Sequence, residues 1–172
     1  MIFRLTLVAS ALVLSACASS TPSGPRAVAQ LQSTTGNATT GTISFTQAGD
    51  KVIIAGEVRG LKPNAEHGFH VHEKGDCSSG DGLSAGGHFN PGGKSHGQHA
   101  MGTHHAGDLP SLKADANGVA KFNLASTSVT VGSGASDIIG RGLIVHRDPD
   151  DYKTQPTGNA GPRLACAVIT RG

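Results

Sequence analysis

The sequence has no strong excess of charge of either sign. Lys and Arg together number 14, Asp and Glu number 12, and the formal net charge is +2. A nucleic-acid-binding surface usually carries a clear basic excess, and this chain has none. We therefore expect no nucleic-acid partner, and no strong electrostatic attraction to an anionic membrane surface.

The sequence also has no apolar run long enough to span a bilayer. Residues 5–14 are almost wholly apolar, but a transmembrane helix needs about 20 such residues. This run follows Arg4 and precedes the small residues Ser15 and Ala16. A charged start, a short apolar stretch and small residues before a cleavage site are typical of a secretory signal peptide. We predict that residues 1–16 form one.

The end of this segment, Leu14-Ser15-Ala16-Cys17, resembles the bacterial lipoprotein box, in which the cysteine is acylated and becomes the new N-terminus. The alternative is an ordinary signal peptide that happens to contain a cysteine. The next eight residues, Ala-Ser-Ser-Thr-Pro-Ser-Gly-Pro, favour a flexible tether. We therefore expect residues 17–26 to be a lipidated Cys17 and its tether. The protein would then be an exported lipoprotein, anchored by its lipid to a membrane of the cell envelope and facing the periplasm.

The chain has only three cysteines, and an odd number leaves one unpaired in an exported protein. If Cys17 carries lipid, Cys77 and Cys166 remain as one pair in an oxidising compartment. A bridge between them closes a loop of roughly 90 residues, which the chain-entropy model credits with about 4 to 5 kcal/mol. The alternative is two buried free thiols. We favour the disulfide.

No segment has the 3.6-residue apolar period of a long amphipathic helix. Gly accounts for 25 of 172 residues, about twice the usual share. Short β-rich runs separated by turn residues indicate an all-β sandwich or flattened barrel of seven or eight strands, in one domain over residues 27–172. The expected strands lie at residues 28–31, 43–45, 52–58, around 70–72, and at 119–124, 129–131, 138–146 and 164–169.

Two connections are longer than the usual turns of a β fold. Residues 73–116 and 147–162 are Gly-rich and polar, and loops of this length in a compact domain are usually functional or disordered. The first contains candidate metal ligands and Cys77. Metal and disulfide can therefore order a segment that its composition alone would leave loose.

Histidine carries the most informative pattern in the chain. His70 and His72 are two residues apart, and a strand directs alternate side chains to one face, so both rings point the same way. Neutral imidazoles side by side suit copper or zinc. Further candidate ligands follow at His88, His96, His105, Asp108 and His146. The chain thus has enough ligands for two metal ions.

Four segments together resemble the copper/zinc superoxide dismutase family. They are Gly-Phe-His-Val-His-Glu at 68–73, Gly-His-Phe-Asn-Pro at 87–91, His-Ala-Gly-Asp-Leu at 105–109 and Gly-Asn-Ala-Gly-Pro-Arg-Leu-Ala-Cys at 158–166. The resemblance extends from Thr42 to Ile169. It implies an eight-stranded Greek-key β-barrel with two long functional loops.

The resemblance also implies one copper and one zinc per subunit. Copper would be held by His70, His72, His88 and His146, and zinc by His88, His96, His105 and Asp108. His88 then bridges the two ions as imidazolate, because two cations can remove the second ring proton. His104 for His105, and His99 for His96, remain alternatives in register.

Two further roles are implied for residues around the copper. Arg163 would dock superoxide at the open copper position, because a guanidinium is always charged and presents fixed donors. His88 would supply a proton when its bond to copper breaks. Lys153 is the only Lys in the second long loop, so electrostatic steering of the substrate should be modest.

A carboxylate would link copper ligand His70 to zinc ligand His96 and fix their tautomers. The resemblance places Asp150 there, with Asp148 and Asp151 as close competitors. Three other histidines match no ligand position. His67 would bond to the backbone, whereas His99 and His104 are either solvated loop residues or auxiliary metal ligands.

The function implied is dismutation of superoxide to dioxygen and hydrogen peroxide by redox cycling of copper, which would protect the cell envelope from extracytoplasmic superoxide. One alternative is a periplasmic copper/zinc-binding or delivery module on the same fold, but this chain keeps every copper ligand and Arg163, which favours the enzyme. A structural, adhesin-like β-domain would not need the ligand set. A homodimer is compatible with the family, although a single sequence identifies no interface.

Overall fold

The computed structural model describes residues 23–172. The predicted signal peptide, Cys17 and the first residues of the predicted tether lie outside the described residues. Within residues 23–172, no helix has the length and apolar character needed to cross a membrane. The first strand begins at Arg26, one residue before the expected start of the domain, because Arg26 already pairs with Thr46.

Short antiparallel strands make up nearly all of the regular structure, as the missing helical period predicts. Among the described residues the only helix is a 3-10 turn at Leu83–Ala85. The strands are β1 (Arg26–Ser33), β2 (Thr40–Ala48), β3 (Lys51–Arg59), β4 (Glu66–His67), β5 (Phe69–His72), β6 (Leu112–Lys113), β7 (Ala120–Ser126), β8 (Gly142–His146), β9 (Arg163–Val168) and β10 (Thr170–Arg171).

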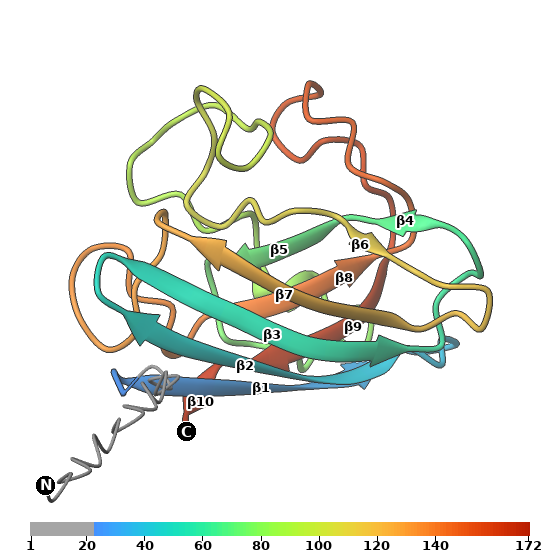
Figure 1. The fold of residues 1–172 in the computed structure, drawn as a ribbon. Coiled ribbons are helices and arrows are strands. Elements are labelled where there is room, and N and C mark those ends of the chain that lie inside the picture. The colour runs from blue at the N-terminus through green and yellow to red at the C-terminus, as the bar shows by residue number, and fades with distance from the viewer. Residues whose placement is uncertain (1–22) are drawn as a thin grey trace, which may run out of the picture.

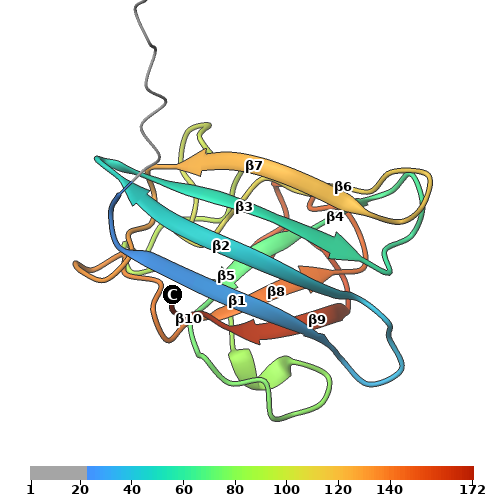
Figure 2. The ribbon, with the colours of Figure 1, turned by 60° about the horizontal axis from the view of Figure 1, so that its bottom comes forward.

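Eight of these strands form one curled antiparallel sheet, and β4 and β6 form a small separate pair (Figure 1). The order in the large sheet is β5-β8-β9-β1-β2-β3-β7, with β10 also paired to β1. The chain crosses from β3 to β5, back to β7, and over again to β8, which is a Greek-key path. Figures 1 and 2 show β5 and β8 facing β2, β3 and β7 across the core. The predicted all-β, eight-stranded architecture is confirmed.

The core lies inside this curled sheet and follows from the alternating pattern of the strands. In β1, for example, Ala27, Ala29 and Leu31 are buried, whereas the residues between them are exposed or half-buried. β8 differs because all five of its residues are buried. Its Ile144 packs outward against Ala85 and Cys166, so the segment around residue 85 covers the outer face of this strand. That second cover explains why β8 is apolar without alternation.

The first long loop, rather than another strand, covers the outer edge of β5. The backbone N–H and C=O of Val71 bond to loop residues at 2.9 and 2.8 Å. On either side, His70 bridges to Asp108 and His72 bridges to His88. Because bridged residues in an antiparallel pair lie only about 4.5 to 5.5 Å apart, this pairing brings loop ligands next to strand ligands.

Two expected strands differ from the observed ones. Residues 129–131 are no strand, although Val129 and Val131 are buried; Thr130 makes only an isolated bridge to Asp137. The expected strand 138–146 begins only at Gly142. The apolar alternation of 129–131 was a sign of burial rather than of strand pairing, because Gly132 with its positive φ turns the chain immediately afterwards.

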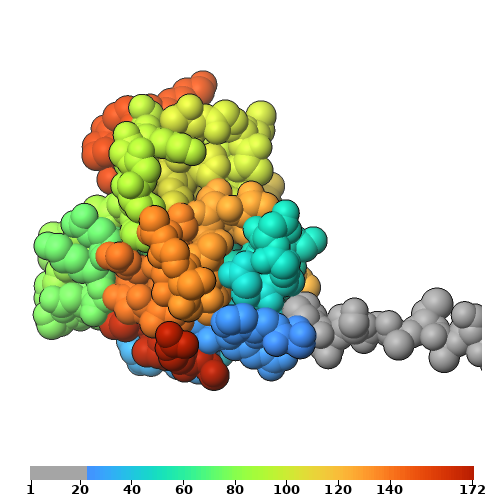
Figure 3. Space-filling view, turned by 90° about the vertical axis from the view of Figure 1, so that its left-hand side faces the viewer, coloured from blue at the N-terminus to red at the C-terminus, as the bar shows by residue number. Residues whose placement is uncertain are grey.

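The two long loops pack together at one end of the barrel. The space-filling view shows residues near 90–105 in yellow-green beside residues near 150–160 in red-orange (Figure 3). Gln155 joins them, since its amide donates to the carbonyl oxygen of His96 and accepts from the His96 N–H at 2.9 and 2.8 Å. A disulfide between Cys77 and Cys166, 89 residues apart, ties the first loop to β9 and confirms the predicted pair.

Candidate metal centre

The structure brings the seven predicted ligands into two buried groups that share one histidine. The first group is His70, His72, His88 and His146, and the second is His88, His96, His105 and Asp108. Within each group, the candidate ligand atoms all lie within 4.8 Å of one another. These memberships are the ones that the sequence predicts; which metal each group holds stays a prediction.

Strand geometry positions the first group. His70 and His72 leave β5 on the same side because they are two residues apart, and His146 ends the neighbouring strand β8. His88 joins them through its bridge to His72. The rings of His70 and His88 are only 4.0 Å apart between centroids.

Four ring nitrogens of the first group have no hydrogen-bond partner. They are Nδ1 of His70 and Nε2 of His72, His88 and His146. An unpaired buried polar group costs about 1 to 3 kcal/mol, so four in one place form an unfavourable arrangement for a chain on its own. A metal ion would use all four lone pairs, and a site made of imidazoles suits copper. The first group therefore fits a copper ion.

Hydrogen bonds at the far side of the rings determine which nitrogen is free. His72 Nδ1 donates to the carbonyl oxygen of Gly86 at 2.9 Å, and His146 Nδ1 donates to that of Gly161 at 3.0 Å. A carbonyl oxygen only accepts, so the ring proton lies on Nδ1. Nε2 of each ring thus keeps its lone pair, as a metal ligand must.

The second group has the spacing of a zinc site. His105 Nδ1 lies 3.4 Å from both His88 Nδ1 and Asp108 Oδ1, and His88 Nδ1 lies 2.8 Å from that same oxygen. His96 Nδ1 lies 3.0 Å from Asp108 Oδ2, yet it has no aligned hydrogen bond. Tetrahedral zinc ligands at 2.0–2.1 Å from the ion lie roughly 3.3 Å apart. The donor set and its spacing therefore fit zinc.

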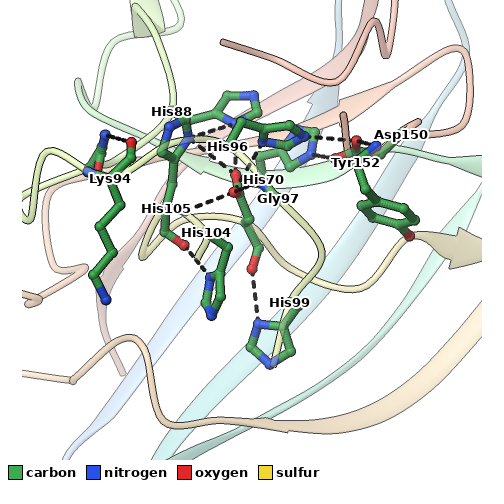
Figure 4. A network of polar contacts seen from close by, with 12 residues as sticks. His70, His88, Lys94, His96, Gly97, His99, His104, His105, Asp150 and Tyr152 are labelled. Carbon is green, nitrogen blue, oxygen red and sulfur yellow. Dashed lines mark hydrogen bonds and ion pairs between the residues drawn. The ribbon is translucent and has the colours of Figure 1, made fainter. Parts of the chain in front are cut away.

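Asp150 connects the two groups. Its carboxylate oxygens lie 2.7 Å from His70 Nε2 and 2.9 Å from His96 Nε2, the nitrogens that face away from the candidate metal positions (Figure 4). The two competitors have other partners, because Asp148 pairs with the adjacent arginine and Asp151 accepts from the Thr154 hydroxyl.

A glycine makes this connection sterically possible. Gly158 has φ +64°, and a Cβ at this position would collide with Asp150 Oδ1 and His96 Nε2. Any side chain would displace the carboxylate from one of its histidines. The second long loop therefore supplies the Asp150 carboxylate to the centre. The absence of a side chain at Gly158 leaves room for that carboxylate between the two histidines.

Burial and carboxylates shift the histidine pKa values in opposite directions. Burial lowers the pKa of His70 to about 4, although its hydrogen bond to the Asp150 carboxylate acts in the opposite direction, and burial lowers the pKa of His72 and His146 well below the usual range. Burial acts on His96 too, but its bonds to two carboxylates outweigh it and raise its pKa to about 9. Without metal, His70, His72 and His146 are thus neutral near pH 7, whereas His96 holds a proton.

A surface pocket of about 440 Å³ opens beside the first group. His72, His146 and Arg163 line it. The guanidinium of Arg163 is held in place by donating to the carbonyl oxygens of Gly82 and Gly86, each at 2.6 Å. The pocket therefore has a fixed, permanent positive charge next to the candidate copper position, which suits a small anion.

Sequence reasoning missed the backbone acceptors and the β1–β2 loop. The carbonyls of Gly86 and Gly161 fix two ring tautomers, and the loop residues Thr34 and Asn37 line the pocket. A carbonyl has no side-chain signature. The only sequence signal for these two carbonyls was a glycine close to a metal ligand or to Arg163. Glycine is a signal because it lets another group approach the backbone closely.

Three histidines lie outside both groups. His67 Nδ1 donates to the carbonyl oxygen of His146 at 2.9 Å, which is the backbone bond that the resemblance suggests. His99 and His104 belong to neither group, and the structure places His96 and His105 there instead.

An all-β barrel whose loops and strands build two metal groups around one shared histidine is a binuclear metalloprotein. Residues 39–169 match the family model described as copper/zinc superoxide dismutase. A Cu-Zn superoxide dismutase of Paramecium bursaria Chlorella virus 1 is 44% identical over 135 residues, which cover 75% of this chain and 71% of the viral protein. A crystal structure of the clock protein EA4 is 44% identical with a TM-score of 0.77, over 88% of this chain and 96% of that one. The chain belongs to the copper/zinc superoxide dismutase family.

Proposed function

We propose that this protein dismutates superoxide to dioxygen and hydrogen peroxide, with copper in the first group and zinc in the second. The observation that carries this proposal is the pocket in which the fixed guanidinium of Arg163 lies beside His72 and His146. Superoxide is a diatomic anion that such a pocket admits. Membership of the copper/zinc superoxide dismutase family supports the same reaction.

When bound, copper supplies one-electron redox chemistry and zinc supplies positive charge without redox change. The residues of the chain do the rest. Arg163 attracts and orients the anion through its charge and fixed donors. His88 directs Nε2 to the first group and Nδ1 to the second, so it can hold a proton at Nε2 whenever that nitrogen is not coordinated. The ring of His88 lies 5.1 Å, between centroids, from the ring of His72, which lines the pocket.

A metal-binding or delivery module on the same fold is the second candidate, because the two ligand groups alone would serve it equally well. Arg163 favours the enzyme, since storage of a cation has no need of a docked anion. The test is metal analysis and dismutase assay on one purified sample. We expect one copper and one zinc per chain, with activity that cyanide inhibits. Zinc alone, and no activity after copper loading, would support the module.

We further propose that the protein is a bacterial lipoprotein that removes superoxide outside the cytoplasm. The support is the sequence of residues 1–17 together with the Cys77–Cys166 disulfide, since disulfides persist in oxidising compartments. Growth with a labelled fatty acid, followed by cell fractionation, tests this proposal. Label should appear on the membrane-bound protein. An unlabelled protein in the soluble cytoplasmic fraction would contradict it.

A further inference from the structure

His99 and His104 form a pair that neither metal group uses. Their ring centroids are 5.5 Å apart, with an angle of 55° between the planes. Ring pairs within the first group have similar spacings, such as 5.6 Å for His72 and His146. The unused pair thus has the ring spacing of a pair whose ligand atoms lie within 4.8 Å of each other.

The two rings are also held in the orientation of metal ligands. His99 Nδ1 donates to the carbonyl oxygen of Asp108 at 2.9 Å, and His104 Nδ1 donates to that of His105 at 2.7 Å. In each ring the contact at Nδ1 is the shorter of the two, so a neutral ring has its proton on Nδ1 and a lone pair on Nε2. His72 and His146 are held in the same way. A backbone acceptor on the second nitrogen is the usual support of a metal-ligating histidine.

Each free nitrogen faces an oxygen at a distance too long for a good hydrogen bond. His99 Nε2 lies 3.4 Å from the carbonyl oxygen of Ala125, and His104 Nε2 lies 3.4 Å from Ser128 Oγ. When the only ring proton of His99 is on Nδ1, His99 Nε2 and the Ala125 carbonyl oxygen are two acceptors that face each other. A cation between the two atoms would satisfy both.

The pair is accessible from solvent, unlike the two buried groups. Both residues are half-buried, and His104 and Ser128 line a surface pocket of about 390 Å³ together with Lys94. Figure 4 shows the rings of His99 and His104 on one side of the polar network, beyond His105. An ion from solution can therefore reach His104 through this pocket, and His99 is itself partly exposed.

We propose that His99 and His104 form an outer metal site for a divalent ion that prefers imidazole, Zn²⁺ or Cu²⁺. The two Nε2 atoms bind the ion, and the Ala125 carbonyl, the Ser128 hydroxyl and water complete its coordination. This site goes beyond the proposed function, because dismutation needs only the two buried groups.

The experiment adds Zn²⁺ alone to protein that already contains its copper and zinc, and measures bound zinc by equilibrium dialysis. The parent protein should take up one further ion per chain. His99→Asn and His104→Asn should each abolish this uptake, because the Asn amide nitrogen occupies nearly the position of Nδ1 and keeps the bond to the backbone while Nε2 is lost. Lys94→Gln, in the same pocket, is the matched control and should still bind the further ion.

Buried copper and zinc content, and dismutase activity, should be unchanged in both Asn variants, so a failure here is distinct from a failure of the proposed function. A parent protein that takes up no further zinc, or Asn variants that keep it, would overturn the site. A second measurement needs no variant. In NMR spectra of the protein with its copper reduced, added Zn²⁺ should shift the ring signals of His99 and His104, and shifts confined to other residues would also overturn it.

Discussion

The two metal groups share His88 but are built in different ways. In the first group, three of the four ligands lie on the paired strands β5 and β8. In the second group, the other three ligands lie on irregular chain in the first long loop. All of these side chains are nevertheless buried. Strand pairing can therefore position a metal site, but a loop needs another source of order to bury its ligands equally well.

In the loop, that source is the carboxylate of Asp108. Besides its contacts with the histidine rings, Asp108 Oδ2 accepts backbone N–H bonds from Gly97 at 3.1 Å and from His105 at 2.8 Å. Charge-assisted bonds of this kind are worth about twice a neutral bond. Asp150 adds the connection from His96 to the strand ligand His70. The loop group is thus organised by two acids, whereas the strand group is organised by the sheet.

The largest expected effect separates the two groups by metal analysis. His146→Ala removes a ligand of the first group only, so we expect loss of copper and of dismutation while one zinc per chain stays bound. Asp108→Ala should lose zinc first and harm copper chemistry only through displacement of His88. Metal content and activity measured on both variants check this partition. Loss of zinc with retention of copper in His146→Ala would show that the groups are assigned to the wrong metals.

The next effect tests the pocket on the strand side. Arg163→Ile should keep both metals but slow turnover by roughly one to two orders of magnitude, because a charge-assisted contact with the anion is worth about 1.5 to 3 kcal/mol. Arg147→Ile is the matched control, since Arg147 is exposed, pairs with Asp148 and does not line the pocket. Steady-state rates at low salt should separate the variants. Equal turnover in both would remove Arg163 from the site.

A third effect concerns the disulfide, which holds the segment before His88 against β9. Cys77→Ser should lower the free energy of unfolding by up to about 4 to 5 kcal/mol, from the lost cross-link in the unfolded chain. The same segment supplies the carbonyls that hold Arg163 and His72, so turnover should fall more than zinc affinity. Urea unfolding under non-reducing conditions checks the stability. Cys166→Ser should behave alike, and combining both changes should add little.

A smaller effect, with opposite signs for His70 and His96, is expected in the metal-free protein. His70 has a folded pKa of about 4, below the ordinary 6.5, so acid favours the unfolded chain and stability falls as the pH drops from 6.5 toward 4. His96 has a folded pKa of about 9, so its contribution is complete below pH 6.5 and is lost as the pH rises through 9. Urea unfolding across this range should show both losses. His96→Gln should flatten the alkaline side alone; an unchanged alkaline loss would contradict the assignment.

The sequence predicts the strand group more directly than the loop group. His70 and His72 follow from strand alternation alone, whereas His96 and His105 needed a family resemblance, because an irregular loop has no period. Asp150 was singled out from two neighbouring acids by resemblance, and the structure shows the physical difference: only Asp150 reaches both rings. The carbonyls of Gly86 and Gly161 could not be predicted, since they depend on where the backbone passes. Residues 129–131 were misread because buried valines alternate whether or not they pair.

The smallest effect is expected where the chain meets its predicted anchor, and it tests whether either metal group depends on that region. β1 starts on the side of the barrel away from the two long loops (Figure 1), and Pro25 is already fixed there by an N–H bond from Gln47 at 2.9 Å. Cys17→Ser should therefore release the domain in soluble form with copper, zinc and activity per copper unchanged. Metal analysis and assay of the membrane and soluble fractions check this. A fall in activity per copper of more than a few-fold would mean that the anchor region and the metal centre are coupled.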